Sequence, residues 1–228
     1  MVSNFVKEGS FPTNITSLEI GSLRVDDFGQ LPSPLEWGLH KLSSLTALQL
    51  HGQEWPWEDT VSFPEEEMFL PTSLVTLSIR HFRNLERLSY EEFQNLTSLQ
   101  RLDIQGCPRL ASFPKEGLPP SLLYLQIYSC PELVTFPEQG FPPSLLSLTI
   151  GERNPILKQK CEKGKEYWPI IQHIPQVSME KLPYSLLPPL AIFTHFYKGF
   201  VVVVETNFRM YACSSSKLHC QFLHLFSR

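Results

Sequence analysis

The sequence contains no long uninterrupted hydrophobic run and no strong excess of either charge. The apolar stretch at 186–204 is broken by two prolines, a histidine, a lysine and a glycine, whereas a membrane-spanning helix needs about 20 mostly apolar residues. The first residues lack the apolar core of a secretory signal. The 19 basic and 23 acidic residues give a net charge of -4, which favours neither nucleic acid nor an anionic membrane as a partner. We therefore expect a cytoplasmic protein that binds no membrane and no nucleic acid.

The five cysteines form no cluster with the spacing of a metal site. Cys107 and Cys130 occupy the same place in two similar segments, and on adjacent strands, about 5 Å apart, they would be close enough for a disulfide. A reducing cytoplasm favours two buried thiols instead. Cys213 and Cys220 lack the paired spacing of zinc ligands. We expect neither a metal ion nor a cofactor.

Side-chain combinations typical of catalysis are missing as well. The histidines before residue 178 are His40, His51, His81 and His173, and none stands in a Ser/His/Asp, Cys/His or metal-ligand spacing. No G-x-x-x-x-G-K-[ST] phosphate-binding loop occurs, because Glu166 follows the one Gly-Lys pair. We therefore expect a protein that is not an enzyme and binds no nucleotide.

A near-copy within the chain indicates the class of fold. Residues 107–121 (CPRLASFPKEGLPPS) and 130–144 (CPELVTFPEQGFPPS) are identical at nine of fifteen positions at an offset of 23. Self-similarity at about 20 to 29 residues is typical of leucine-rich repeats, in which each unit contributes one strand and buries its apolar edge against its neighbours. We predict an α/β leucine-rich repeat solenoid, with a curved parallel sheet on the concave face and irregular loops and short helical turns on the convex face.

An apolar frame, L-x-x-L-x-L, extends the repeat in both directions to six units. The units begin at Ile15, Leu45, Leu74, Leu99, Leu122 and Leu145, which are 30, 29, 25, 23 and 23 residues apart. Alternate side chains of such a strand point into the core, so the intervening ones face outward. The predicted outward columns are Ser17, Glu19, Gly21; Ala47, Gln49, His51; Thr76, Ser78, Arg80; Arg101, Asp103, Gln105; Tyr124, Gln126, Tyr128; and Ser147, Thr149, Gly151.

The third to fifth units carry the chemically richest outward side chains. Arg80, Arg101, Asp103, Tyr124 and Tyr128 form one predicted patch, and arginine and tyrosine are common at binding hot spots. This patch is the candidate protein-binding site. The alternative is a plain solvated face, on which Arg101 and Asp103 form a weak surface pair worth under about 1 kcal/mol.

A long insertion separates the second and third units. Residues 51–73 contain Trp55, Trp57 and an acidic run at 65–67. One interpretation is a solvated loop whose tryptophans fold back on the convex side. The other is a partner-binding loop, because exposed tryptophans often mark contact sites.

The repeats are predicted to form one domain over residues 1–177, followed by a tail of different composition. The segment 155–163 (PILKQKCEK) predicts a short helix with proline in its first turn and Gly164 as a stop, and 155–177 as a whole is predicted to cap the last repeat. Residues 178–228 contain only two acidic residues and are expected to be poorly structured. The amino end begins inside a repeat, from which we expect the carboxy-terminal part of a longer protein.

Two motifs resemble a known family. The unit C-P-x-L-x-x-F-P-x-x-G-x-P-P-S-L occurs twice, and the run CEKGKEYWPIIQHIP covers residues 161–175. Both resemble the final leucine-rich repeats of plant disease-resistance proteins of the coiled-coil, nucleotide-binding type, over roughly residues 5–177. The sequence departs from that family at Asn154, where the family usually has cysteine before the proline, and where the spacing is one residue longer.

The resemblance implies a leucine-rich repeat recognition and autoinhibition module of an intracellular plant immune receptor, which acts in innate immunity through protein-protein contact. Its implied partners are a pathogen effector or a guarded host protein, and the nucleotide-binding domain of the same receptor, which these residues do not contain. One alternative is a substrate adaptor of a ubiquitin ligase, which would need an F-box ahead of the repeats. A hydrolytic enzyme is the other.

Overall fold

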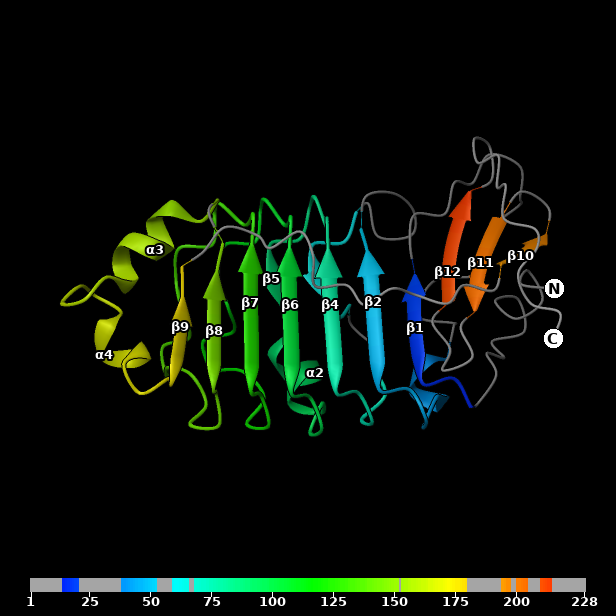
Figure 1. The fold of residues 1–228 in the computed structure, drawn as a ribbon, viewed down its shortest axis with the longest axis horizontal. Coiled ribbons are helices and arrows are strands. Elements are labelled where there is room, and N and C mark those ends of the chain that lie inside the picture. The colour runs from blue at the N-terminus through cyan, green and yellow to red at the C-terminus, as the bar shows by residue number, and fades with distance from the viewer. Residues whose placement is uncertain are drawn as a thin grey trace, which may run out of the picture.

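In the computed structural model, seven parallel strands of the described part of the chain form a sheet along one face (Figure 1). The structure describes residues 14–20, 38–52, 59–65, 68–151 and 153–179, together with strands at 194–197, 200–204 and 210–214. The sheet has the order β1-β2-β4-β6-β7-β8-β9. Its strands are β1 (Ser17–Ile20), β2 (Ala47–His51), β4 (Thr76–Arg80), β6 (Arg101–Gln105), β7 (Tyr124–Tyr128), β8 (Ser147–Ile150) and β9 (Gln176–Ser178).

Equivalent positions of successive repeats face each other in this sheet. Leu102 pairs with Leu77 on one side and with Leu125 on the other. All three leucines are fully buried, and burial of a leucine side chain contributes about 1.5–3 kcal/mol. Each strand can bury its leucines only against those of the neighbouring repeats. The result is an α/β fold with a mostly parallel sheet and few helices, which is compatible with a leucine-rich-repeat-like fold.

The strand β9 was not predicted from the sequence. Its first backbone N–H, at Gln176, donates to the carbonyl of Leu146 at 3.0 Å, and its residues pair in parallel with β8. The segment QVS holds a single apolar residue, Val177, so it matches no L-x-x-L-x-L frame. Backbone pairing with β8, rather than its own pattern, therefore makes this segment a strand.

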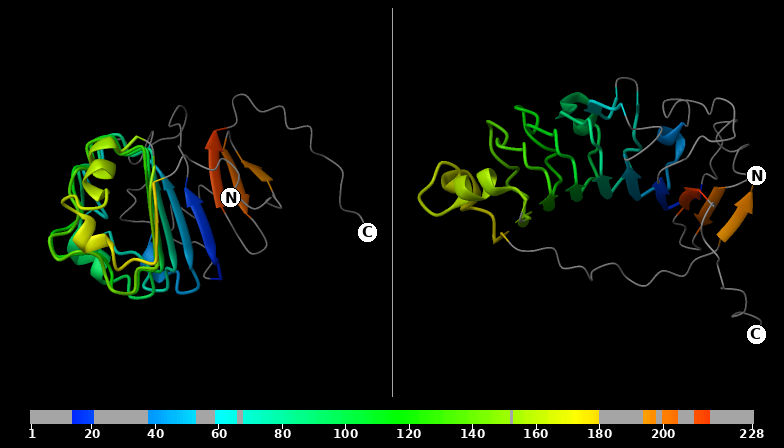
Figure 2. Two further views of the ribbon diagram at one scale, coloured as in Figure 1. Left: turned by 60° about the vertical axis from the view of Figure 1, so that its left-hand side comes forward. Right: turned by 90° about the horizontal axis from the view of Figure 1, so that it is seen from above.

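Loops, short strands and short helices form the side opposite the sheet (Figure 2). The short strands β3 (Ser62–Phe63) and β5 (Arg87–Leu88) pair in parallel, and single bridges continue this ladder to Ser112 and Thr135. The helices η2 (Leu39–Lys41) and α2 (Tyr90–Gln94) precede β2 and β6. Successive repeats therefore pair on both sides of the core.

The insertion at 51–73 is not entirely a solvated loop. Its residue Phe63 belongs to β3 and is fully buried, with its ring centroid 5.8 Å from that of Phe82. Met68 and Leu70 are also buried. The apolar side chains of the longer repeat thus fill the interior, while both tryptophans of the insertion lie outside the described residues.

Serine side chains link consecutive repeats and explain the final residues of the P-P-S-L motif. Each serine stands directly before the leucine that opens a unit, and its hydroxyl donates to the carbonyl of the opening leucine of the previous unit. The three bonds run from Ser73 to Leu45 at 2.7 Å, from Ser121 to Leu99 at 2.8 Å and from Ser144 to Leu122 at 2.8 Å. The motif therefore satisfies buried carbonyl groups between the strands.

The chain leaves three of the strands through a residue with positive φ. His81, Gly106 and Ser129 stand at equivalent places, with φ angles of 60°, 69° and 53°. The N–H of His81 donates to Gln105 O at 2.7 Å, so the turn still takes part in the ladder. The left-handed conformation costs a residue with a Cβ atom roughly 1–2 kcal/mol, and glycine avoids this cost.

Ser129→Gly is therefore expected to raise the free energy of unfolding by about 0.5–1 kcal/mol. Glycine adopts a φ of 53° without the Cβ clash, although its greater freedom in the unfolded chain offsets part of the gain. The measurement is the urea midpoint of the full chain. Ser129→Ala retains a Cβ atom and serves as the control; equal midpoints for the two variants would show that no backbone strain is relieved.

A buried column of side chains follows the last four repeat strands, β4, β6, β7 and β8. It consists of Phe82, Cys107, Cys130 and Asn154, all at most 1% exposed. Cys107 and Cys130 are free thiols, as predicted, and the hydrogen-bonding contact with Cys130, followed by burial, raises the pKa of the Cys107 thiol. The same structural position is therefore filled by a phenyl ring, two thiols and an amide in successive repeats.

Asn154 ends the column with an amide in place of a thiol. Its Oδ1 accepts a hydrogen bond from the backbone N–H of Cys130 at 3.3 Å, and its Nδ2 donates to the Cys130 carbonyl at 3.1 Å. The departure from the expected Cys-Pro spacing thus brings a side chain that satisfies both backbone groups of the preceding repeat.

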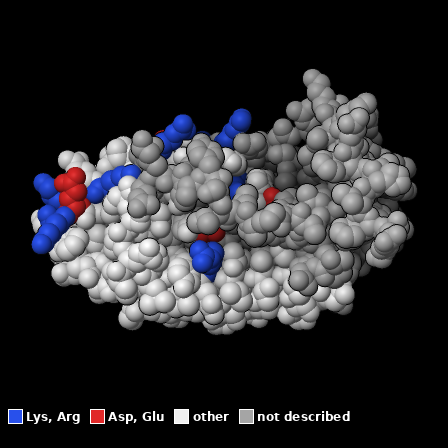
Figure 3. Space-filling model, viewed as in Figure 1, with Lys and Arg blue, Asp and Glu red and all other residues white. Residues whose placement is uncertain are grey.

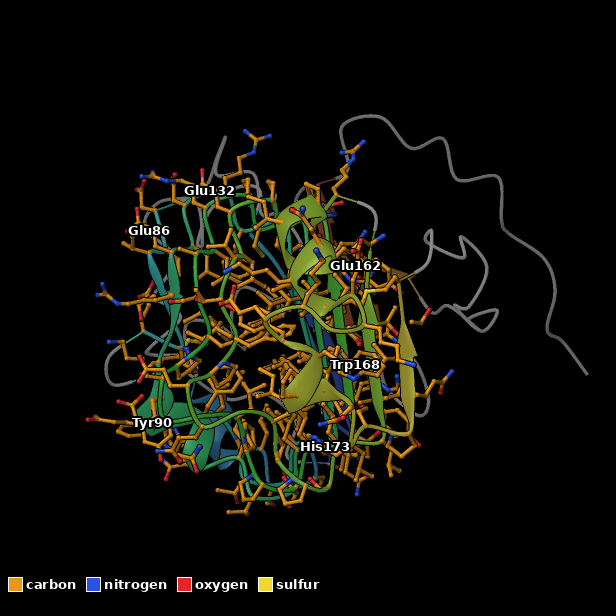
Figure 4. The ribbon with its side chains drawn as sticks, turned by 90° about the vertical axis from the view of Figure 1, so that its left-hand side faces the viewer. Glu86, Tyr90, Glu132, Glu162, Trp168 and His173 are labelled. Carbon is orange, nitrogen blue, oxygen red and sulfur yellow. The ribbon has the colours of Figure 1, made fainter. Side chains whose placement is uncertain are left out.

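Two short helices cover the last repeat (Figure 4). Helix α3 (Pro155–Cys161) begins at the predicted proline and ends two residues earlier than predicted, before Gly164, which has a φ of 81°. Helix α4 (Trp168–Ile171) follows, and its residue Ile171 is fully buried. The ring of Tyr167 lies 4.9 Å from that of Phe136, and packing of this kind joins the helices to the core.

Within 178–228 the structure describes three strands that pair antiparallel. They are β10 (Thr194–Tyr197), β11 (Phe200–Val204) and β12 (Met210–Ser214). The expectation of a poorly structured tail concerns for the most part residues outside the described ones, and it stays a prediction. In the part of the chain that the structure describes, no helix has the length and apolar character needed to cross a membrane.

Candidate protein-binding face

Three rows of side chains cross the face of the parallel sheet. The first row contains Ser17, Ala47, Thr76, Arg101, Tyr124, Ser147 and Gln176. The second contains Glu19, Gln49, Ser78, Asp103, Gln126, Thr149 and Ser178, and the third contains His51, Arg80, Gln105 and Tyr128. The rows agree with the outward columns predicted from the sequence at all but two positions. Gly21 lies outside the described residues, and Gly151 follows the end of β8 and is buried.

Charged side chains are sparse on the described part of this face (Figure 3). The described strands contribute two basic side chains, Arg80 and Arg101, and two acidic ones, Glu19 and Asp103. Four of the five predicted site residues, all except Tyr128, are partly exposed. The face is therefore mainly neutral and polar, with its cations on β4 and β6.

Arg101 and Tyr124 are direct neighbours in the first row. The guanidinium carbon of Arg101 lies 4.5 Å from the centroid of the Tyr124 ring, which is a cation–π contact. Such a contact is worth about 0.5–1 kcal/mol at an exposed site. The contact places the guanidinium over the ring and is not a hydrogen bond, so it uses none of the N–H donors.

Asp103 lies in the second row, two residues beyond Arg101 along β6. Among the described residues its Oδ1 is buried and has no hydrogen-bond partner, and it forms no ion pair with Arg101 or Arg80. The weak surface pair that the sequence suggested for Arg101 and Asp103 is therefore not formed. Burial raises the pKa of the Asp103 carboxyl, although the charges of Arg101 and Arg80 oppose this shift.

Arg80 and Tyr128 occupy the third row, at the carboxyl ends of β4 and β7. The Nε–H of Arg80 donates to Ser78 Oγ at 3.0 Å. Tyr128 is only 9% exposed, and its ring occupies the space beside Gly151, where an added Cβ atom would lie 2.3 Å from Cδ1 of the ring. The structure thus brings Arg101, Asp103 and Tyr124 together and places Tyr128 against the next repeat.

Gly151→Ala is expected to displace the Tyr128 ring and to lower the free energy of unfolding by about 1–3 kcal/mol, as overpacking does. The contact involves ring atoms alone, so Tyr128→Ala in the same background should restore part of the loss. A double-mutant cycle from urea unfolding of the full chain measures this coupling. Additive effects of the two substitutions would contradict the packing of Tyr128 over Gly151.

A polar cluster at the β1 and β2 end of the sheet was missed in the sequence. His51 Nε2 lies 3.0 Å from Glu19 Oε1 and 2.8 Å from Gln49 Nε2, and the His51 ring is 6.2 Å from that of His81. Burial, followed by the charges of His51 and Arg80, lowers the pKa of His81. Glu19 and His51 are 32 residues apart, and only the predicted columns place them on neighbouring strands.

The described residues contain no group of three or more His, Cys, Asp or Glu side chains that could hold a metal ion. The three described cysteines are buried, and burial raises the pKa of the Cys161 thiol to about 12. The partly exposed groups of the face are hydrogen-bonding, cationic and aromatic. An arrangement of this kind suits contact with another macromolecule.

Comparison with known proteins finds similarity to two proteins of Arabidopsis thaliana. The chain is 37% identical over 112 residues to a putative disease resistance protein, a match that covers 49% of this chain and 7% of that protein. It is 54% identical over 48 residues to a subunit of general transcription and DNA repair factor IIH, a match that covers 21% of this chain and 10% of that protein. No family model matches the chain. No solved structure matches it either.

Both relatives are much longer than the matched segments, since the chain spans at most a tenth of either one. The first match is the longer and covers about half of this chain. This similarity supports a relationship between the chain and a plant disease-resistance family.

Proposed function

We propose that this chain is a leucine-rich repeat recognition module of an intracellular plant immune receptor. The observation that carries the proposal is the alignment of polar side chains in three rows on the sheet face, in a chain similar to a putative disease resistance protein. Rows of this kind present many side chains to one partner on a rigid support. The module acts in plant defence through protein-protein contact, without chemistry of its own.

Two kinds of partner follow from this role. A pathogen effector, or a host protein that the effector modifies, would be recognised at the rows on β4, β6 and β7. There the Arg101 guanidinium lies over the Tyr124 ring, and both residue types are common at binding hot spots. A nucleotide-binding domain of the same receptor would be held inactive by contact with the repeats. The same surface serves both partners if binding of the first releases the second.

The test is genetic complementation in the plant that carries the gene. Disruption of the gene should abolish resistance to at least one pathogen of a panel, and the unchanged gene should restore it. The double variant Arg101→Gln, Tyr124→Ala should fail to restore resistance, because it removes the cation–π pair while leaving the buried leucines intact. Protein abundance in leaves is measured for each variant.

Arg109→Gln is the matched control, since Arg109 pairs with Glu86 at 2.9 Å, and Figure 4 shows Glu86 on the side of the molecule away from the sheet. Complementation by this control but not by the double variant would support recognition at the face. Spontaneous cell death in plants with the double variant would support autoinhibition. Unchanged resistance after gene disruption, or full complementation by the double variant, would contradict the proposal.

A further inference from the structure

The two arginines of the sheet face have no carboxylate partner among the described residues. The Nε–H of Arg80 donates to the hydroxyl of Ser78, and the guanidinium of Arg101 lies on the Tyr124 ring. A guanidinium carries five N–H donors, and these contacts use one donor of Arg80 and none of Arg101. Both arginines therefore keep most of their donors for a partner.

Among the described residues, the Asp103 carboxyl forms no ion pair with either arginine, although the charges of both arginines act on it and oppose the rise of its pKa. Its Oδ1 atom is buried, so a partner on the sheet face does not reach this oxygen. The two guanidinium groups are therefore the part of the patch that a partner can bind.

The sheet places the two arginines on neighbouring strands. Arg80 pairs with Gln105, four residues from Arg101 along the strands, but its Nε–H bond to Ser78 turns its guanidinium back toward the second row. Alternate side chains of an extended peptide lie on one side of it, so a peptide laid along β4 and β6 can direct one carboxylate to each guanidinium.

We propose that the partner of this face presents an extended acidic segment, which binds Arg80 and Arg101 through two carboxylates on the same side of the segment. The proposal rests on the proposed function in taking this face as the recognition surface. Charge-assisted hydrogen bonds between guanidinium and carboxylate are roughly twice as strong as neutral ones, and two of them at fixed spacing select for sequence as well as charge.

A nucleic acid fits this face less well than an acidic peptide. Its phosphates carry one charge per nucleotide along each strand, and proteins that bind it present a row of basic side chains. The described strands of the sheet offer two arginines, and Glu19 lies on the same face. Two carboxylates match two isolated cations better than a continuous row of phosphates does.

The test measures binding of the full 228-residue chain to an array of synthetic peptides. Each peptide has a serine and glycine scaffold with two glutamates two to six positions apart, and a matched set has glutamine at both positions. We expect the glutamate peptides to bind with an affinity about tenfold above the glutamine set, and most strongly at an even separation, which places both carboxylates on one side of the extended peptide. Arg80→Gln and Arg101→Gln should each remove most of this preference.

Arg109→Gln again serves as the control and should bind like the unchanged chain, because Arg109 already has Glu86 as its partner. Circular dichroism verifies the fold of each variant, and Arg80→Lys, which retains the charge, should bind with intermediate affinity. Equal binding of the glutamate and glutamine sets, or an equal loss in Arg109→Gln, would overturn the proposal. Displacement of the peptides by an equal concentration of oligothymidylate would also overturn it, in favour of a nucleic-acid site.

The peptide array and the complementation experiment distinguish failure of the acidic-segment proposal from failure of the proposed function. A negative array with positive complementation would remove the acidic segment and leave the proposed function in place. Selective peptide binding with unchanged plant resistance would support this surface and remove the proposed role in defence.

Discussion

Asn154→Ala is expected to lower the free energy of unfolding by about 2–4 kcal/mol. The Asn154 side chain is 1% exposed and makes two hydrogen bonds to the backbone of Cys130. Alanine would leave the buried N–H and carbonyl of Cys130 without these partners, and each buried unsatisfied group costs about 1–3 kcal/mol. The loss also weakens the joint between the last repeat and α3, because Asn154 directly precedes that helix.

Urea unfolding of the full chain measures this effect, and for a protein of this size a loss of 1 kcal/mol corresponds to a melting temperature about 2–4 °C lower. Asn95→Ala is the matched control, because Asn95 is exposed and its change should stay within about 0.5 kcal/mol. Asn154→Asp retains an acceptor for the Cys130 N–H but places a carboxylate oxygen against the Cys130 carbonyl, so it should also destabilise. An unchanged midpoint in Asn154→Ala would show that the two hydrogen bonds contribute nothing to stability.

Phe82→Ala is expected to cost about 3–5 kcal/mol, the usual range for a fully buried aromatic side chain. The Phe82 ring is fully buried, packs edge-on against Phe63 and occupies the space next to Gly52, where an added Cβ atom would lie 2.4 Å from Cγ of the ring. Truncation removes this ring and leaves a cavity between the second and third repeats, which the rigid ladders on both sides cannot close fully.

Phe69→Ala provides the control, since the Phe69 side chain is 53% exposed and its loss should change stability by less than about 0.5–1 kcal/mol. Phe82→Leu tests the cavity itself, because leucine fills part of the volume and should recover part of the loss. Thermal and urea unfolding of the three variants give the comparison. Equal losses for Phe69→Ala and Phe82→Ala would contradict the buried role of the Phe82 ring.

Much of the sheet could be predicted because its signal is local and repeated. The leucines of the L-x-x-L-x-L frame recur at equivalent places, and Leu77, Leu102 and Leu125 meet in the structure as that frame requires. The alternation of a strand then assigns the outward rows without further information. For the same reason the neighbours Arg101 and Tyr124 could be named from the sequence.

The contacts within the rows could not be predicted. The sequence permitted a pair between Arg101 and Asp103, yet the guanidinium lies on Tyr124, and among the described residues the Oδ1 atom of Asp103 is buried without a hydrogen-bond partner. Register places residues on a face, but the choice among several reachable partners depends on side-chain rotamers and on desolvation. The cluster of Glu19 and His51 escaped notice for a similar reason, since a diagonal contact across 32 residues carries no sequence motif.

The sequence by itself determined the repeat, its six strands and the rows of residues on the sheet face, because periodic burial of leucine leaves one arrangement in which every apolar edge is covered. Only the tertiary structure decided the conformation and burial of residues that do not belong to the leucine repeat. It made β9 a strand through backbone pairing with β8, drew Phe63 of the long insertion into the core, and gave Asn154 the two backbone groups of Cys130 as partners. Such residues depend on groups supplied by another repeat, and those groups exist as partners only once the repeats are stacked.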